Sequence, residues 1–173
     1  FKSVPVVGEI AWDLYDQIQE IPPFYPKRDL SKPTMQVKST YSLIRTKRWG
    51  EHFIKRLSKN PLPLISTFFI PAFQAEEFNY PGDIYLVICD ADISRAWAPF
   101  TPSRSRIRYL APTLRAVDRL QLYGVPKDHI ILTGFPLPQD NYEHNGTVVR
   151  ADLARRLLNL DPLGVYGKKY SRT

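Results

Sequence analysis

The sequence contains one cysteine, Cys89, and no long uninterrupted apolar run. A single cysteine excludes an internal disulfide bond and a metal site built from cysteines alone. A membrane-spanning helix needs about 18 or more apolar residues in a row, so none is predicted. The histidines, His52, His129 and His144, lack metal-ligand spacing with one another and with Cys89. We therefore predict no metal site and assign no catalytic histidine.

Several signature motifs are also missing. The chain has no P-loop, no Gly-x-Gly-x-x-Gly and no Gly-x-Ser-x-Gly, which argues against an NTPase, a dinucleotide-dependent oxidoreductase and an α/β-hydrolase. No signal peptide is visible, and the first residue is Phe1 rather than Met. We therefore expect an excised or processed piece of a longer cytoplasmic protein.

Composition and charge are those of a globular protein with a basic surface. Of 173 residues, 43% are hydrophobic and 24% are charged, which is enough for one domain with a core. The net charge of +7 favours anionic partners. Nucleic acid, phosphorylated ligands and an anionic membrane surface all fit, and a basic surface that serves only solubility is the alternative.

Short apolar runs alternate with helical patterns along the chain. The predicted strands are 62–69, 84–89, 107–111 and 129–133. This alternation predicts an α/β fold, a Rossmann-like parallel sheet of about four strands flanked by helices. Ile84 to Cys89 is a near-continuous apolar run, which predicts a central strand. The run Ile130, Ile131 and Leu132 is typical of a strand buried on both faces.

Six segments have helical patterns, at 8–20, 35–44, 46–59, 72–78, 112–123 and 148–160. In 46–59, Trp49, Phe53 and Leu57 form an apolar stripe among lysines and arginines. This helix packs on the sheet through its stripe or, alternatively, lies on an anionic membrane.

The helix at 112–123 has clear start and stop signals. Pro112 suits a first turn, and Gly124 can take the positive φ that ends a helix. Leu114, Val117 and Leu120 are expected to face inward. We expect one domain over residues 1–160, with a helical N-terminal part (1–60) and a sheet core (61–138), and a linker or tail at 161–173.

Candidate site residues follow the predicted strand 84–89, because ligands of open α/β sheets bind at the carboxyl ends of the strands. Asp90 and Asp92 could act as a general base or hold a cation, and the alternative is a helix N-cap. Arg95 could clamp a phosphate and Trp97 could stack on a sugar or base. In the alternative, Trp97 packs over the sheet edge while Arg95 pairs with an Asp.

The same region resembles a known enzyme superfamily. The resemblance rests on Val87-Ile88-Cys89-Asp90, Trp97, Gly124-Val125-Pro126, Ile130 and Thr133-Gly134-Phe135-Pro136. This pattern resembles the second half of the N-terminal domain of GT-B glycosyltransferases. It is most similar to the monogalactosyldiacylglycerol synthase and processive diacylglycerol glucosyltransferase types. Related segments recur in UDP-N-acetylglucosamine 2-epimerases.

The resemblance implies a partial GT-B N-terminal domain on the acceptor side of a transferase. That enzyme would move a sugar from a nucleotide donor to a lipid or other hydroxyl acceptor. Asp90 or Asp92 would be the base, and Ser94, Arg95, Trp97 and Thr133-Gly134-Phe135-Pro136 would line the cleft. Ser94 stands near the position where the family has a histidine.

The resemblance also implies partners that this chain does not contain. A C-terminal domain would bind the nucleotide-sugar donor, so we expect no cofactor in this chain and no activity from it alone. An anionic membrane surface or a lipid acceptor is the other expected partner, with peripheral membrane attachment. The alternatives are a non-catalytic basic module that binds anionic lipid or, less favoured, nucleic acid, and an epimerase-like sugar-nucleotide enzyme.

Overall fold

The computed structural model describes residues 20–136, 153–156, 159–161, 163–165 and 168. The chain divides into two compact units, 1–135 and 136–173, which are treated separately. The predicted helix 8–20 lies outside the described residues except for its last residue. In the second unit, 153–156 and 159–160 are helical, within the predicted helix 148–160. The predicted extension of the first domain to residue 160 stays a prediction.

The first unit is an α/β layer built on a four-stranded parallel sheet, as predicted. The strands are β1 (Leu64–Ser66), β2 (Ile84–Val87), β3 (Arg108–Ala111) and β4 (Ile130–Leu132), in the order β1-β2-β3-β4. The helices are α2 (Met35–Thr46), α3 (Glu51–Leu57), α4 (Phe69–Glu77) and α5 (Leu114–Leu122). Short 3₁₀ turns are η1 (Arg95–Trp97), η2 (Pro102–Arg104) and η3 (Lys127–His129).

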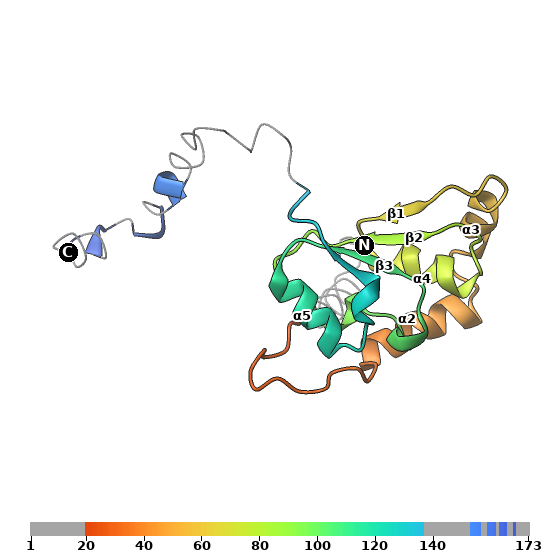
Figure 1. The fold of residues 1–173 in the computed structure, drawn as a ribbon, viewed down its shortest axis with the longest axis horizontal. Coiled ribbons are helices and arrows are strands. Elements are labelled where there is room, and N and C mark those ends of the chain that lie inside the picture. The colour runs from red at the N-terminus through yellow and green to blue at the C-terminus, as the bar shows by residue number, and fades with distance from the viewer. Residues whose placement is uncertain (1–19, 137–152, 157–158, 162, 166–167, 169–173) are drawn as a thin grey trace, which may run out of the picture. The chain divides into compact units, whose positions relative to one another are not determined.

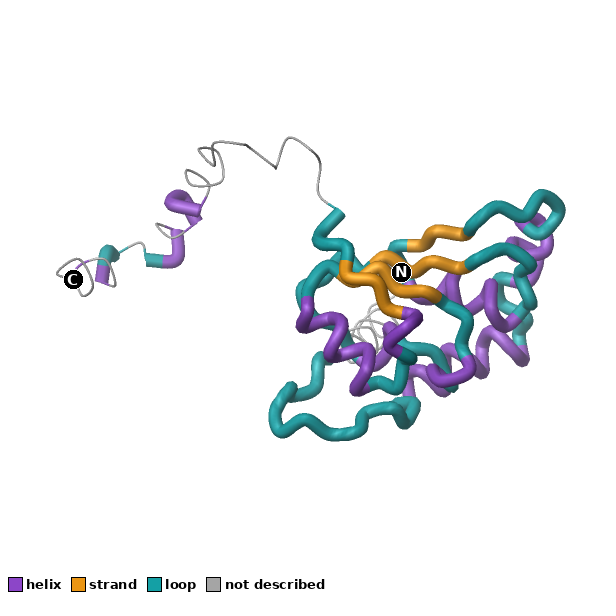
Figure 2. Tube along the Cα trace, viewed as in Figure 1, coloured by secondary structure: helices purple, strands orange, loops and turns teal. Residues whose placement is uncertain are grey.

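The helices lie on one side of the sheet. Figure 1 shows α2, α4 and α5 on the same side of the strands, and Figure 2 shows the same layering by element type. Sequential parallel strands joined by right-handed crossovers produce this arrangement, because each crossover helix returns over the same face. The sheet is therefore covered on one face by the described helices.

Side chains alternate between the covered face and the other face. Ile84 and Leu86 of β2 and Tyr109 of β3 are buried under the helices. On the opposite face Ile65 is exposed and Ile131 is 45% exposed. The expectation that β4 is buried on both faces is wrong, because β4 is an edge strand and no described element covers its outer face.

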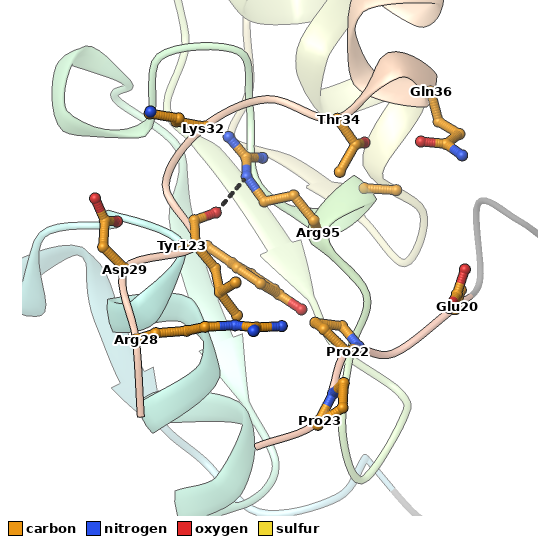
Figure 3. Close-up of a pocket in the computed structure, with 12 residues that line it drawn as sticks. Glu20, Pro22, Pro23, Arg28, Asp29, Lys32, Thr34, Gln36, Arg95 and Tyr123 are labelled. Atoms are coloured by element: carbon orange, nitrogen blue, oxygen red, sulfur yellow. Dashed lines mark hydrogen bonds between the residues drawn. The ribbon is translucent and has the colours of Figure 1, made fainter. Parts of the chain in front are cut away.

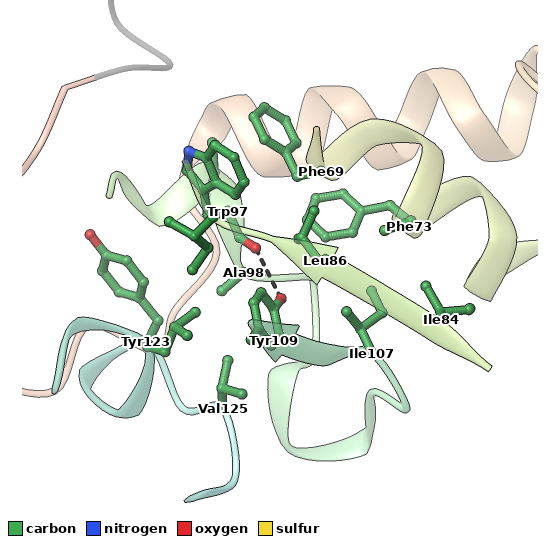
Figure 4. Packing of buried hydrophobic residues seen from close by; sticks show 14 of the residues in the cluster. Phe69, Phe73, Ile84, Leu86, Trp97, Ala98, Ile107, Tyr109, Tyr123 and Val125 are labelled. Atoms are coloured by element: carbon green, nitrogen blue, oxygen red, sulfur yellow. Dashed lines mark hydrogen bonds between the residues drawn. The ribbon is translucent and has the colours of Figure 1, made fainter. Parts of the chain in front are cut away.

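The core lies between the sheet and the helices. Figure 4 shows Phe69 and Phe73 of α4 facing Leu86 and Tyr109 of the sheet. The hydroxyl of Tyr109 donates to the carbonyl of Trp97 at 2.9 Å. This bond satisfies the one polar group that Tyr109 takes into the core.

The predicted starts of α3, α4 and α5 differ from the observed ones. Gly50, at φ 90°, precedes α3, so the helix begins at Glu51 rather than 46. As a result Ile54 is the buried residue, whereas Trp49 and Phe53 are 45% and 47% exposed. The predicted inward stripe is therefore wrong at Trp49 and Phe53, whereas Leu57 is partly buried against the core as predicted.

The helix α5 begins two residues after Pro112. The side chain of Thr113 accepts a hydrogen bond from the N–H of Ala116, which makes Thr113 the N-cap. Leu114 is 70% exposed, so its predicted inward position is wrong. Leu120 is buried as predicted, Val117 is partly buried against the core, and Arg119 also lies on the buried face of α5. At β1 the strand is also shorter than predicted, because Phe69 already belongs to α4.

Candidate functional site

The carboxyl edge of the sheet presents one free carboxylate. Cys89 and Asp90 follow β2 and are exposed. Within the described part of the chain, the carboxylate of Asp90 makes no hydrogen bond or ion pair. It is therefore available to a ligand at the edge where ligands of open α/β sheets bind.

Asp92, two residues further, is held by α5. Its oxygens accept hydrogen bonds from the Nε and Nη2 atoms of Arg119 at 2.9 and 2.8 Å, and one oxygen also accepts from the N–H of Ile93. Arg115 lies 3.5 Å away on the same carboxylate. Burial raises the pKa of Asp92, but the bonds from Arg119 and Ile93 and the two positive charges outweigh it and hold the pKa below its usual value. A carboxylate held in this way positions the loop rather than accepting a proton.

Arg95 points into the protein, not toward the carboxyl edge. Its side chain is 4% exposed, and it donates to the carbonyl oxygens of Leu30, Ser31, Ala98 and Pro99 at 2.6–3.2 Å. The predicted partner was a phosphate or an aspartate, and the observed partners are backbone carbonyls. Arg95 thus fixes the segment around residue 30 against η1.

Trp97 and Ser94 are also buried. The Trp97 ring packs edge-on against Phe69, with ring centroids 5.5 Å apart. The packing alternative for Trp97 is therefore the one observed, and its ring is not open to a sugar. Ser94 is the N-cap residue of η1, and its buried hydroxyl has no hydrogen-bond partner in the described structure.

The turn after β4 lies at the exposed edge. The N–H of Thr133 donates to the carbonyl of Ala111 at 2.9 Å, which continues the parallel ladder by one residue. Gly134 has φ 83° and turns the chain away. Phe135 is half-buried, and Pro136 is exposed in the second unit.

The structure thus brings together only part of the predicted site. Asp90 and Thr133 share the carboxyl edge, separated by the end of β3, which at the usual strand spacing is about 10 Å. Thr113, at the end of β3, lies between them and donates to the carbonyl of Ala91 at 2.8 Å. Asp92, Ser94, Arg95 and Trp97 do not face this edge as free side chains.

Sequence reasoning missed Arg119, which forms the ion pair that holds the carboxylate of Asp92. Arg119 is 1% exposed and lies on the buried face of α5 beside Leu120. The available signal was its position three residues after Ala116, a spacing that places two side chains on one face of a helix. A carboxylate is a strong partner for a buried guanidinium, and Asp92 supplies it here.

Two other kinds of site are absent from the described residues. No group of three or more His, Cys, Asp or Glu side chains among them could hold a metal ion. No helix among them is long and apolar enough to cross a membrane.

Comparison with known protein families, with curated proteins and with solved structures gave no match.

Proposed function

We propose that this chain is the acceptor-side domain of a GT-B-like glycosyltransferase, acting on a lipid or other hydroxyl acceptor. The observation that carries the proposal is the free carboxylate of Asp90 at the carboxyl end of the interior strand β2. The Thr133–Gly134 turn lies at the same edge of the sheet, as the family resemblance of these segments implies. The parallel Rossmann-like sheet supports the proposal at the level of fold alone.

In this proposal Asp90 is the general base. It accepts the proton of the acceptor hydroxyl, the hydroxyl oxygen bonds to the anomeric carbon of the donor sugar, and the nucleoside diphosphate leaves with the bonding electrons. The Thr133 hydroxyl donates within its own turn, to the carbonyl of Gly134 at 3.1 Å, so it stiffens the turn rather than reacting. An acceptor bound to both Asp90 and this turn would cross the end of β3.

In this proposal the nucleotide-sugar donor is bound by a partner domain. A domain outside residues 1–173 would bind the nucleotide sugar, and the chain by itself would turn over no donor. The chain would still bind an acceptor. Acceptor binding is therefore the property to test on this chain.

The test is a titration of the ¹⁵N-labelled chain with dihexanoylglycerol, a soluble diacylglycerol with one free hydroxyl. We expect amide shifts to cluster at residues 89–91 and 133–135. Asp90→Ala should weaken binding about threefold or more, because it removes a hydrogen-bond acceptor for the hydroxyl. Asp83→Ala is the matched control, because Asp83 is exposed at the amino end of the same strand. Shifts elsewhere, or equal effects of the two variants, would contradict the proposal.

A specific observation supports one second candidate, a non-catalytic module that binds an anionic membrane surface. Trp49 and Phe53 are about half exposed, and Lys47 and Arg56 are exposed close to them in the chain. Exposed aromatics among cations are the features of an interfacial membrane-binding segment. Lys55 adds less positive charge to this surface, because its ammonium pairs with the carboxylate of Glu51 at 2.9 Å.

Vesicle co-sedimentation tests the membrane candidate. If the membrane candidate is right, the chain binds phosphatidylserine vesicles more tightly than neutral phosphatidylcholine vesicles, and Trp49→Ser with Phe53→Ser abolishes most of that binding. Tyr25→Ser is the control, because Tyr25 is a more exposed aromatic on a different segment. Binding that is insensitive to both changes would count against this candidate.

A further inference from the structure

A cavity of about 400 Å³ opens beside the buried Arg95, on the helix side of the sheet. Figure 3 shows the cavity between the segment that leads into α2 and the side chains of Arg95 and Tyr123. Pro22, Pro23 and Tyr123 form an apolar part of its lining, and Thr34 and Gln36 form a polar part. A cavity of this size and mixed lining suits a small ligand.

Arg95 brings an uncompensated positive charge to this cavity. It has no carboxylate partner among the described residues, and it donates all four of its hydrogen bonds to neutral carbonyl groups. Since Nη1 donates only to Ala98, one of the five guanidinium N–H groups is left over. Burial also lowers the pKa of Arg95, although its side chain stays charged at neutral pH. A buried cation without a counter-ion is costly, and an anion bound nearby would relieve that cost.

The N-terminus of α2 lines the same cavity. Thr34 is its N-cap and accepts from the N–H of Val37 at 3.4 Å, which leaves the N–H groups of Met35 and Gln36 without a helical partner. The helix is 12 residues long, and its first turn carries no acidic side chain. Its partial positive charge is therefore not neutralised from within the helix.

Two further cations stand at the mouth of the cavity. Arg28 and Lys32 line it, are exposed, and make no ion pair within the described structure. The acidic side chains of the lining are Glu20 and Asp29. Asp29 accepts a hydrogen bond from the N–H of Ser31 at 2.8 Å, so its carboxylate is held in its own turn. The balance of charge around the cavity favours an anion.

We propose that this cavity binds a phosphorylated small molecule. The phosphate lies at the N-terminus of α2, near the Arg28 and Lys32 side chains and the buried positive charge of Arg95, since cations and helix N-termini are groups that bind phosphate in proteins. The uncharged part of the ligand lies against Pro22, Pro23 and Tyr123. This site is separate from Asp90 and does not depend on the proposed transferase function.

The test is isothermal titration calorimetry of the full chain with glucose 6-phosphate, and with glucose as the uncharged counterpart. We expect the phosphorylated sugar to bind at least about tenfold more tightly than glucose. Arg28→Gln with Lys32→Gln should weaken it by about tenfold, since each removed cation costs a few-fold in affinity. Lys38→Gln is the matched control, because Lys38 is an exposed cation of α2 that does not line the cavity.

Three results would overturn the proposal: equal binding of glucose and glucose 6-phosphate, an equal loss in the Lys38→Gln variant, or no binding. Asp90→Ala should leave glucose 6-phosphate affinity unchanged, so failure here and failure of the transferase proposal are distinguishable.

Discussion

Arg119 holds Asp92 through two parallel hydrogen bonds of 2.9 and 2.8 Å, and this pair joins α5 to the loop that follows β2. The guanidinium also stands over the ring of Phe24, with 5.0 Å between its carbon and the ring centroid. The pair therefore connects three segments that are distant in sequence. Asp92 has the residue type of a catalytic base, but its contacts are those of a structural ion pair.

The first prediction concerns the stability that this pair supports. Asp92→Asn should reduce the free energy of unfolding by about 3–5 kcal/mol, because it leaves the buried guanidinium of Arg119 without a counter-charge. The measurement is urea denaturation followed by circular dichroism. Asp90→Asn, at an exposed position nearby, should stay within about 0.5 kcal/mol of the parent chain. A small effect at Asp92 would mean that water or other groups solvate Arg119.

The second prediction is the acid dependence of the same pair. The pKa of Asp92 is lower in the folded chain than in the unfolded chain, so the unfolded chain binds the proton more readily. The stability from the pair is therefore present above the unfolded pKa of about 4 and is lost as pH falls through the lower folded pKa. Denaturation series between pH 6 and pH 2.5 should show a steeper acid loss for the parent than for Asp92→Asn. Parallel curves would contradict this linkage.

The third prediction applies to the alkaline side. Burial raises the pKa of Tyr109 well above 10, and the nearby Tyr41 and Glu76 add to the shift while Arg95 opposes it. Because the folded pKa is raised, the contribution of Tyr109 is complete below the unfolded pKa of about 10 and is lost as pH rises through the folded value. Tyr109→Phe should therefore flatten the decline of stability above pH 10 by up to about 1.4 kcal/mol per pH unit. Tyr25→Phe, at an exposed site, is the control and should leave that decline unchanged.

The sheet was predictable because its signals are local. Apolar runs at Ile84, Ile107 and Ile130 are spaced for βα units, and Gly124 marks the end of the helix before β4. Their parallel order follows from chirality and short connections. The exposure of Ile131 was not predictable, because an apolar run is the same whether one face or both faces of a strand are covered.

The candidate site was less predictable for a different reason. Arginine and tryptophan serve both in binding sites and in buried structural clusters, and Arg95 and Trp97 proved to be buried. The information that decides between these roles is the burial of the whole segment 93–99, which depends on α2, α4 and α5 packing over it. Asp90 is exposed at the carboxyl edge because it directly follows a strand, where the chain leaves the core.

The fourth prediction tests the one-sided cover of the sheet. Leu86→Ala should lower the free energy of unfolding by about 2–5 kcal/mol, because the Leu86 side chain of β2 is fully buried on the face that the helices cover. Ile131→Ala should cost less than about 1 kcal/mol, because its side chain is already about half exposed on the open face. Both values come from urea denaturation of the full chain. A loss of several kcal/mol at Ile131 would show that this face is covered in solution.

The last prediction separates backbone strain from crowding at two glycines with positive φ. Gly50 has φ +90°, and a Cβ there would lie 2.2–2.4 Å from the Gln74 side chain. Gly134 has φ +83°, and a Cβ there would meet nothing within 4 Å. Gly134→Ala should therefore cost about 1–2 kcal/mol from the left-handed backbone alone. Gly50→Ala should cost about 1–3 kcal/mol more, because Gln74 is buried and must be displaced. Gly50→Ala combined with Gln74→Ala should recover the crowding part but not the strain, and urea denaturation of the four chains measures each part.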